Sequence, residues 1–220
     1  MTRENQQIVA HRGGKGKAPE NSRMAINNAL TAGINWIEVD ARITRDGRIV
    51  VHHDATIGRT TNGHGFVRRK TLPQLRRYRL ANGESIATLE EIIDLVAGRA
   101  NLWIDIKGGV RTAEAVVRIV RKKEVENSVV MSSMRPWVIK RIRSLSDLAR
   151  TSLFAFFSCY KVWLGKRLGV EFIQPRFLLT KRFLARARKA NLHVITWPVA
   201  TGWETQMKKV LFLDFAGKQK

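Results

Sequence analysis

Short apolar runs alternate along the chain with longer segments in which apolar residues recur every three or four positions. The short runs predict buried strands, and the longer segments predict amphipathic helices. Strands are expected at 8–10, 36–43, 49–51, 102–106, 129–132, 153–157, 172–174 and 193–197, with a further strand at 211–215. Helices are expected at 22–30, 71–80, 88–96, 113–125, 135–148, 162–168 and 181–190.

Turn and capping residues mark several boundaries between these elements. Asp46 and Gly47 separate two strand-like runs, which is a strong signal for a hairpin. Residues 54–69 contain glycines and threonines with no sustained period and predict an irregular segment. Thr88 is followed three residues later by Glu91, the pattern of a capping box at the start of a helix.

The order of the elements predicts the fold class. Repeated strand-then-helix units of about thirty residues are typical of parallel strands joined by crossover helices. A doubly wound sheet and a (β/α)8 barrel both fit this order, and the number of strands favours the barrel. We therefore expect a single α/β domain over 1–220, a (β/α)8 TIM barrel with a small insertion after the second strand, at about 45–85. No covering helix follows 211–215, so closure of the barrel at its C-terminal end is expected to be atypical.

Composition is that of a folded protein with a large positive charge. Hydrophobic residues make up 44% of 220 residues, which excludes a collagen or a wholly disordered chain. Cys159 is the only cysteine, so neither a disulfide framework nor a zinc cluster is available. The sequence shows no membrane-spanning or targeting segment, and a cytoplasmic location is therefore expected.

The net charge of +22 favours anionic partners, such as nucleic acid, an anionic lipid surface or a small phosphate compound. Most of this charge lies after residue 110, and no aromatic pattern typical of nucleic-acid recognition accompanies it. We therefore expect no specific nucleic-acid partner, and at most weak contact with an anionic membrane surface.

In barrels the reactive side chains lie at the carboxyl ends of the strands. Those ends carry His11 and Arg12, Glu38 and Asp40, His53 and Asp54, Asp105 and Lys107, and Trp197. Glu38 and Asp40 are two residues apart and so share one face of a strand, and Asp105 on the next strand can complete an oxygen-only site. Such a site suits Mg²⁺ or Ca²⁺ better than zinc.

These residue types together suit the cleavage of a phosphate ester. A metal and nearby cations stabilise charge on the phosphoryl oxygens, while His11 and His53 can act as acid and base. Each residue also has a structural interpretation. Either histidine alone could be structural. Glu20, Asn21 and Trp197 are further candidates for contact with substrate, although Trp197 could belong to the core, and Glu20 and Asn21 could cap the first helix.

Several motifs, in this order and spacing, resemble the glycerophosphodiester phosphodiesterase family. They are His11-Arg12-Gly13, Ala18-Pro19-Glu20-Asn21-Ser22, Trp36-Ile37-Glu38-Val39-Asp40, Thr44-Arg45-Asp46-Gly47, Val50-Val51-His52-His53-Asp54 and Gly58-Arg59-Thr60-Thr61-Asn62-Gly63. The resemblance implies a (β/α)8 barrel that hydrolyses glycerophosphodiesters to an alcohol and glycerol 3-phosphate with a divalent metal.

The same resemblance implies a role for each matching residue. It assigns His11 and His53 as the acid/base pair, Arg12 and Lys107 as phosphate contacts, and Glu38, Asp40 and Asp105 as metal ligands. His52 would be the non-catalytic neighbour of His53. The third metal ligand is commonly glutamate in the family, and Asp105 is one methylene shorter.

Two other functions also fit the sequence. A barrel without catalysis could use its basic surface to bind nucleic acid or an anionic membrane, and would then bind polyanions with steep salt dependence and no turnover. A related barrel lipase of the sphingomyelinase D kind would share the histidines and metal carboxylates, although its secreted, disulfide-bearing character is absent here. Within the leading interpretation, the attacking group could be water or the glycerol 2-hydroxyl of the substrate.

Overall fold

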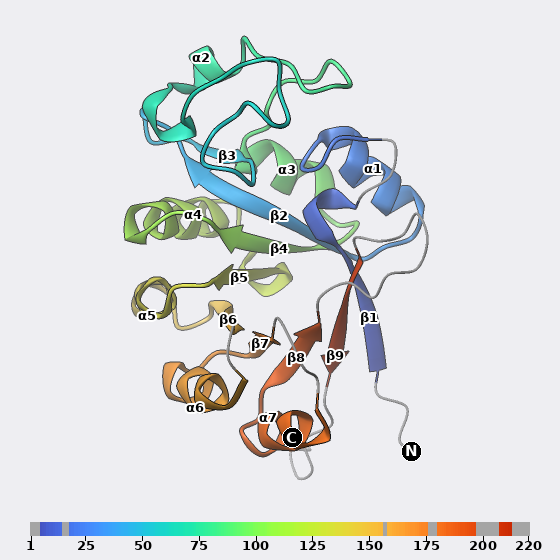
Figure 1. The fold of residues 1–220 in the computed structure, drawn as a ribbon, viewed down its shortest axis with the longest axis vertical. Coiled ribbons are helices and arrows are strands. Elements are labelled where there is room, and N and C mark those ends of the chain that lie inside the picture. Colours follow the sequence, from blue (N-terminus) through green and yellow to red (C-terminus); the bar gives the residue numbers. More distant parts are fainter. Residues whose placement is uncertain (1–4, 15–17, 156–157, 176–179, 197–206, 213–220) are drawn as a thin grey trace.

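The computed structural model describes residues 5–14, 18–155, 158–175, 180–196 and 207–212, and within these it forms a barrel (Figure 1). The strands run in the order β1-β9-β8-β7-β6-β5-β4-β2-β3, and an additional pairing of β1 with β2 closes the ring. The strands are β1 Asn5–Ala10, β2 Trp36–Ile43, β3 Ile49–Val51, β4 Asn101–Ile106, β5 Val129–Ser133, β6 Arg150–Ala155, β7 Phe172–Pro175, β8 His193–Thr196 and β9 Met207–Phe212. The predicted barrel class is confirmed.

Helices cover the outside of this sheet, with α4 to α7 following successive strands (Figure 1). They are α1 Arg23–Thr31, α2 Leu72–Leu75, α3 Leu89–Val96, α4 Val110–Lys122, α5 Pro136–Leu145, α6 Ser158–Leu168 and α7 Lys181–Lys189, with 3₁₀ turns at His11–Gly13, Val67–Arg69 and Glu126–Ser128. No helix in the described part of the chain is both long and apolar enough to span a bilayer.

The capping and turn signals act as the sequence predicts. The Ser22 hydroxyl accepts a hydrogen bond from the Ala25 N–H and starts α1, and Thr88 and Glu91 form both bonds of a capping box at α3. The Asp46-Gly47 turn joins β2 to β3 as an antiparallel pair. Gly47 adopts a φ of +79°, a value that favours glycine.

The last strand differs from the prediction. It was expected at 211–215 and lies instead at Met207–Phe212, so residues 213–215 fall outside the described residues. β9 is antiparallel to both β1 and β8. A parallel crossover needs a dozen or more residues, and the sequence leaves only 197–206 between β8 and β9, so the antiparallel pairing is the one that this spacing permits.

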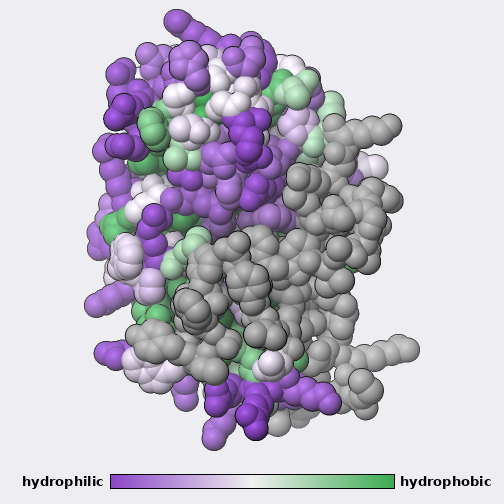
Figure 2. Space-filling view, in the orientation of Figure 1, coloured by the Kyte–Doolittle hydropathy of each residue, from purple (hydrophilic) through white to green (hydrophobic). Residues whose placement is uncertain are grey.

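A second difference lies in the insertion, where the helix expected at 71–80 shortens to α2, Leu72–Leu75. The backbone after α2 is held by other parts of the insertion. The Arg79 N–H donates to the Asn62 side chain, and Leu80 forms an isolated bridge with Thr61. Figure 2 shows the surface over this insertion, at the top of the view, largely in the purple of hydrophilic residues.

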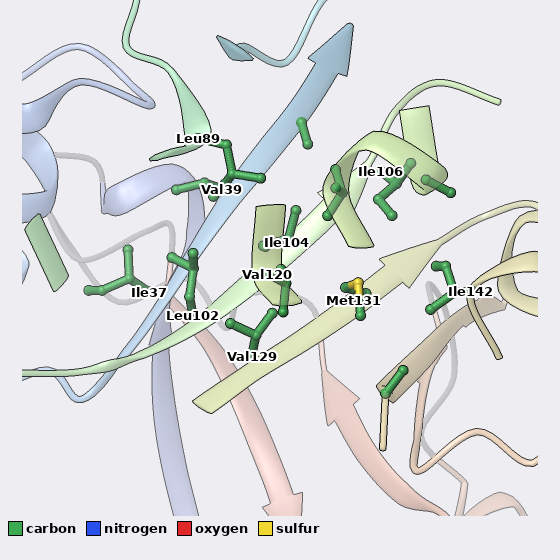
Figure 3. Close-up of a cluster of buried hydrophobic side chains, with 14 of the residues drawn as sticks. Ile37, Val39, Leu89, Leu102, Ile104, Ile106, Val120, Val129, Met131 and Ile142 are labelled. Carbon is green, nitrogen blue, oxygen red and sulfur yellow. The ribbon is translucent and has the colours of Figure 1, made fainter. Parts of the chain in front are cut away.

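Strand alternation divides most buried side chains of the parallel barrel strands between two regions. One set, which includes Ile37, Val39 and Ile104, packs between the sheet and its helices (Figure 3). The other fills the barrel interior with side chains from six strands, namely Val9, Trp36, Trp103, Val130, Phe172 and Ile195. Side chains at every second position of a strand share one face, so Glu38 and Asp40, which follow Trp36 on β2, also point inward. Asp105 does the same after Trp103 on β4.

Candidate active site

Three acidic side chains meet inside the carboxyl end of the barrel. Glu38 and Asp40 lie on β2 and Asp105 lies on β4, where Asp40 and Asp105 are register partners. One carboxylate oxygen from each lies within 4.8 Å of the others. Their exposed fractions are 1%, 0% and 8%, respectively. Three buried carboxylates so close together repel one another unless positive charge compensates them.

Neighbouring side chains hold two of these carboxylates in place. The Asn21 amide donates to Asp40 Oδ2 over 2.8 Å, and its carbonyl accepts the Asp40 backbone N–H. The Ser132 hydroxyl on β5 donates to Asp105 Oδ1 over 3.2 Å. These bonds leave the opposite carboxylate oxygens of both residues facing Lys107.

Lys107, just after β4, supplies positive charge to the cluster. Its Nζ lies 2.6 Å from Asp105 Oδ2 and 3.1 Å from Asp40 Oδ1. Burial alone would lower the pKa of this lysine, but the charges of Asp105 and Asp40 outweigh it and raise the pKa above its usual value. Lys107 is therefore positively charged at neutral pH.

Arg12 supplies further positive charge from the turn after β1. Its backbone N–H donates to Glu38 Oε2 over 2.7 Å, and its Nε lies 3.6 Å from Asp40 Oδ2. The turn is tight, because Arg12 has a φ of +56° and a Cβ at Gly13 would lie 2.9 Å from the Ile26 side chain. Glycine at position 13 thus allows the turn to pack on α1 while Arg12 faces the acids.

The two histidines assigned from sequence follow β1 and β3, which both pair with β2. His11 is buried, and its Nε2 lies 3.8 Å from Glu38 Oε2. His53 follows β3 and is partly exposed, and its Nδ1 lies 2.6 Å from Asp54 Oδ1. His52 points away, toward the Thr56 carbonyl, and burial lowers its pKa.

Several residues to which the sequence analysis assigned no role belong to the same site. Asp54 contacts His53, Ser132 contacts Asp105, and the Arg42 guanidinium donates to the His53 carbonyl. Arg59 forms ion pairs with both Glu20 and Asp54. Asp54 and Arg59 lie within motifs that the sequence already displays, whereas nothing in the sequence links Ser132 to Asp105 before β4 and β5 are paired. Trp197 lies outside the described residues.

The acidic cluster fits a divalent metal ion. Its donors are all oxygens, they come from two rigid strands, and second residues already orient Asp40 and Asp105. Oxygen donors of this kind are the ligands of hard cations such as Mg²⁺ and Ca²⁺.

Comparisons with known proteins identify relatives of one family. Residues 11–217 match the model of the glycerophosphoryl diester phosphodiesterase family. A glycerophosphodiester phosphodiesterase of Caldanaerobacter subterraneus subsp. tengcongensis is 27% identical over 206 residues, which cover 87% of this chain and 85% of that protein. Glycerophosphodiester phosphodiesterase 1 of Homo sapiens is 34% identical over 66% of this chain, and the match spans about half of that relative, 47%.

Solved structures agree on the fold. A phosphodiesterase of Oleispira antarctica, solved with the product sn-glycerol-3-phosphate, superposes with a TM-score of 0.82 at 22% identity and covers 89% of this chain and 85% of that one. A glycerophosphodiester phosphodiesterase of Agrobacterium tumefaciens gives a TM-score of 0.79 at 24% identity, over 88% of this chain and 87% of that one.

Proposed function

The chain belongs to the glycerophosphoryl diester phosphodiesterase family, and on that basis we propose that it hydrolyses glycerophosphodiesters to an alcohol and sn-glycerol 3-phosphate by metal-assisted acid/base catalysis. One observation carries this proposal. Three buried carboxylates, two histidines and the cations Arg12 and Lys107 lie on or just after β1, β2, β3 and β4, at one end of the barrel. Small-molecule diesters such as glycerophosphocholine and glycerophosphoethanolamine are the proposed substrates.

Glu38, Asp40 and Asp105 would hold the divalent ion, either Mg²⁺ or Ca²⁺. When bound, such an ion stabilises negative charge on phosphoryl oxygens and orients the phosphate. Arg12 and Lys107 flank the same carboxylates and bring two more positive charges to the place where the phosphate would lie. Their guanidinium and ammonium groups then stabilise the charge that develops on the phosphate during cleavage.

His11 and His53 are the proposed acid/base pair. One histidine takes a proton from the attacking water or glycerol 2-hydroxyl, and the other gives a proton to the leaving alkoxide. Attack by the 2-hydroxyl forms a cyclic phosphate, which water then opens to glycerol 3-phosphate with the two histidines in exchanged roles. The carboxylate of Asp54 beside His53 Nδ1 can hold that ring in position. His11 Nε2 lies beside Glu38, which places it next to the metal ligands.

Glu20 and Asn21 take positioning roles in this proposal. Both Glu20 oxygens accept hydrogen bonds from Arg12 Nη1, at 3.1 Å each, and both also bind Arg59. The Asn21 amide is engaged with Asp40. These contacts support a positioning role for each, with Glu20 fixing the proposed phosphate contact Arg12 and Asn21 fixing the proposed metal ligand Asp40.

The proposal is tested by product formation. The purified protein is incubated with glycerophosphocholine and glycerophosphoethanolamine, and glycerol 3-phosphate is measured with an enzyme-coupled assay. Release of glycerol 3-phosphate should stop with EDTA and return with Mg²⁺ or Ca²⁺. His11→Ala and His53→Ala should each lower kcat by about 10²- to 10⁴-fold, whereas His64→Ala, an exposed histidine of the insertion, should behave as wild type. Turnover that survives both chelation and His11→Ala would contradict the proposal.

A further inference from the structure

We propose that Arg59, in the insertion, is a positioning residue that holds both His53 and Arg12 in their working places. The inference rests on the proposed function, because it assigns Arg59 a task in that same reaction. Among the described residues, Arg59 reaches the site through two carboxylates, Glu20 and Asp54, and so its proposed action is through other residues and not on the substrate.

One arm of this arrangement runs from Arg59 to Arg12. Arg59 Nη1 and Nη2 donate to the two oxygens of Glu20, at 3.1 and 2.5 Å. Glu20 is buried, with 8% of the residue exposed, and the same two oxygens accept hydrogen bonds from Arg12 Nη1. The carboxylate therefore lies between two guanidinium groups and fixes the outer end of Arg12, whose Nε faces Asp40.

The other arm runs from Arg59 to His53. The third donor of the guanidinium, Nε, binds Asp54 Oδ2 over 2.5 Å. The second oxygen of Asp54, Oδ1, contacts His53 Nδ1 over 2.6 Å. Asp54 is thus held from one side by the insertion, and its remaining oxygen is directed at the imidazole ring.

The segment that carries Arg59 is itself anchored. Ile57 is fully buried in the core of the insertion, and its carbonyl accepts bonds from both the backbone and the hydroxyl of Thr61. Thr56 and Phe66 form a bridge that closes the loop. In contrast, the Arg59 side chain is 49% exposed, so its three contacts do not serve core packing. The loop is thus fixed, and its exposed arginine binds two carboxylates of the site. This arrangement is expected of a positioning residue.

The geometry also explains why arginine is needed. Three nitrogens of one planar group meet two carboxylates in different directions. A lysine ammonium is a single point charge and cannot reproduce this fork. Arg59→Lys should therefore keep part of the effect, and Arg59→Met, which keeps an unbranched stem but loses all three donors, should remove it.

The experiment compares steady-state kinetics for variants of each arm. Asp54→Asn should lower kcat with little change in KM, since it affects the acid/base histidine. Glu20→Gln should mainly raise KM, since it affects the phosphate-contacting Arg12. Arg59→Met should do both, with a loss in kcat of about ten- to a hundredfold, and Arg59→Lys should lie between it and wild type. In a protein that already carries Asp54→Asn, Arg59→Met should lower kcat only slightly further, because Arg59 acts on His53 through Asp54.

Two further measurements separate this inference from the proposed function. Arg77→Met removes an exposed arginine of the same insertion that is not part of the network, and it should leave kcat and KM unchanged. The ¹⁵N resonance of His53 Nδ1, assigned with His53→Gln, should shift in Arg59→Met but not in Arg77→Met, whether or not turnover is detected. An Arg59→Met protein with wild-type kcat, KM and His53 resonance would overturn the inference. Absence of turnover in wild type, with the resonance still shifting, would instead count against the proposed function alone.

Discussion

Asp40 and Asp105 are register partners across the parallel pair β2 and β4, and a single ammonium group, that of Lys107, contacts both. Two inward carboxylates at the same level of a barrel would otherwise repel each other in a buried setting. The chain thus carries its own partial compensation for the acidic cluster. A divalent ion bound by the same carboxylates would add to this compensation, and the stability of the protein should report its binding.

Removing Lys107 should make the fold depend on the metal. Lys107→Met leaves Asp40 and Asp105 without their ammonium partner, and the free energy of unfolding without metal should fall by about 3 kcal/mol. Added Mg²⁺ or Ca²⁺ should restore more stability to this variant than to wild type, because the cluster has more uncompensated charge. Urea unfolding with and without the ion measures both quantities. Lys122→Met, an exposed lysine of α4, is the control, and equal gains in variant and wild type would contradict the prediction.

The hydroxyl of Ser132 should matter for metal affinity although it is not a proposed ligand. It donates to Asp105 Oδ1 and so directs the other oxygen of that carboxylate. Outer partners of this kind typically change metal affinity by about ten- to a hundredfold. Calorimetric titration of Ser132→Ala should show weaker binding by about that factor. Ser144→Ala, on the exposed side of α5, should bind as wild type does, and an unchanged affinity in Ser132→Ala would show that Asp105 needs no such support.

Loss of side-chain volume in the buried layer between the sheet and its helices should destabilise the protein. Ile104 on β4 is fully buried between the sheet and its helices (Figure 3). Ile104→Ala should lower the free energy of unfolding by about 2–5 kcal/mol, through lost burial and the cavity left behind. Leu148→Ala, at a leucine that is 68% exposed, should change it by less than about 0.5 kcal/mol. Chemical denaturation of both variants gives the comparison, and similar losses would mean that Ile104 does not sit in a tightly packed core.

Much of this fold can be predicted from local signals. The strand at 36–43 and the helix that begins after Thr88 match β2 and α3, because strand alternation and a capping box act over a few residues. The inward placement of Glu38 and Asp40 follows from the same alternation once β2 is known to line a barrel. Their proximity to Asp105 needed one non-local inference, that the next parallel strand lies beside β2, and the pairing of β2 with β4 confirms it.

What the sequence did not predict depends on contacts between distant residues. β9 pairs with β1, at the other end of the chain, and no local signal specifies this partner. Thr71 and Gln74 form a capping box, but the helix ends after one turn because later residues bind elsewhere in the insertion. The ion pair of Arg59 with Glu20 joins residues 39 positions apart, and neither residue has a local feature that specifies the other.

Glu20 makes this network sensitive to acid. Burial alone would raise the pKa of its carboxyl, but the hydrogen bonds and positive charges of Arg59 and Arg12 outweigh burial and lower the pKa from 4.5 to about 2. In the unfolded chain these partners are lost and the pKa returns to its ordinary value. Folding therefore favours the deprotonated form of Glu20.

Because the pKa of Glu20 is lower in the folded state, its contribution to stability should be complete above pH 4.5 and should disappear as the pH falls toward 2. The full contribution is about 3 kcal/mol, and roughly half of it should be lost between pH 4.5 and 3. Urea unfolding of wild type and Glu20→Gln from pH 6 to pH 3 should show two curves that converge on the acid side. Asp147→Asn, at an exposed aspartate, should instead follow wild type throughout. Parallel curves for wild type and Glu20→Gln would mean that the two arginines do not hold the carboxylate charged, and Glu20 would then be unable to anchor either of them.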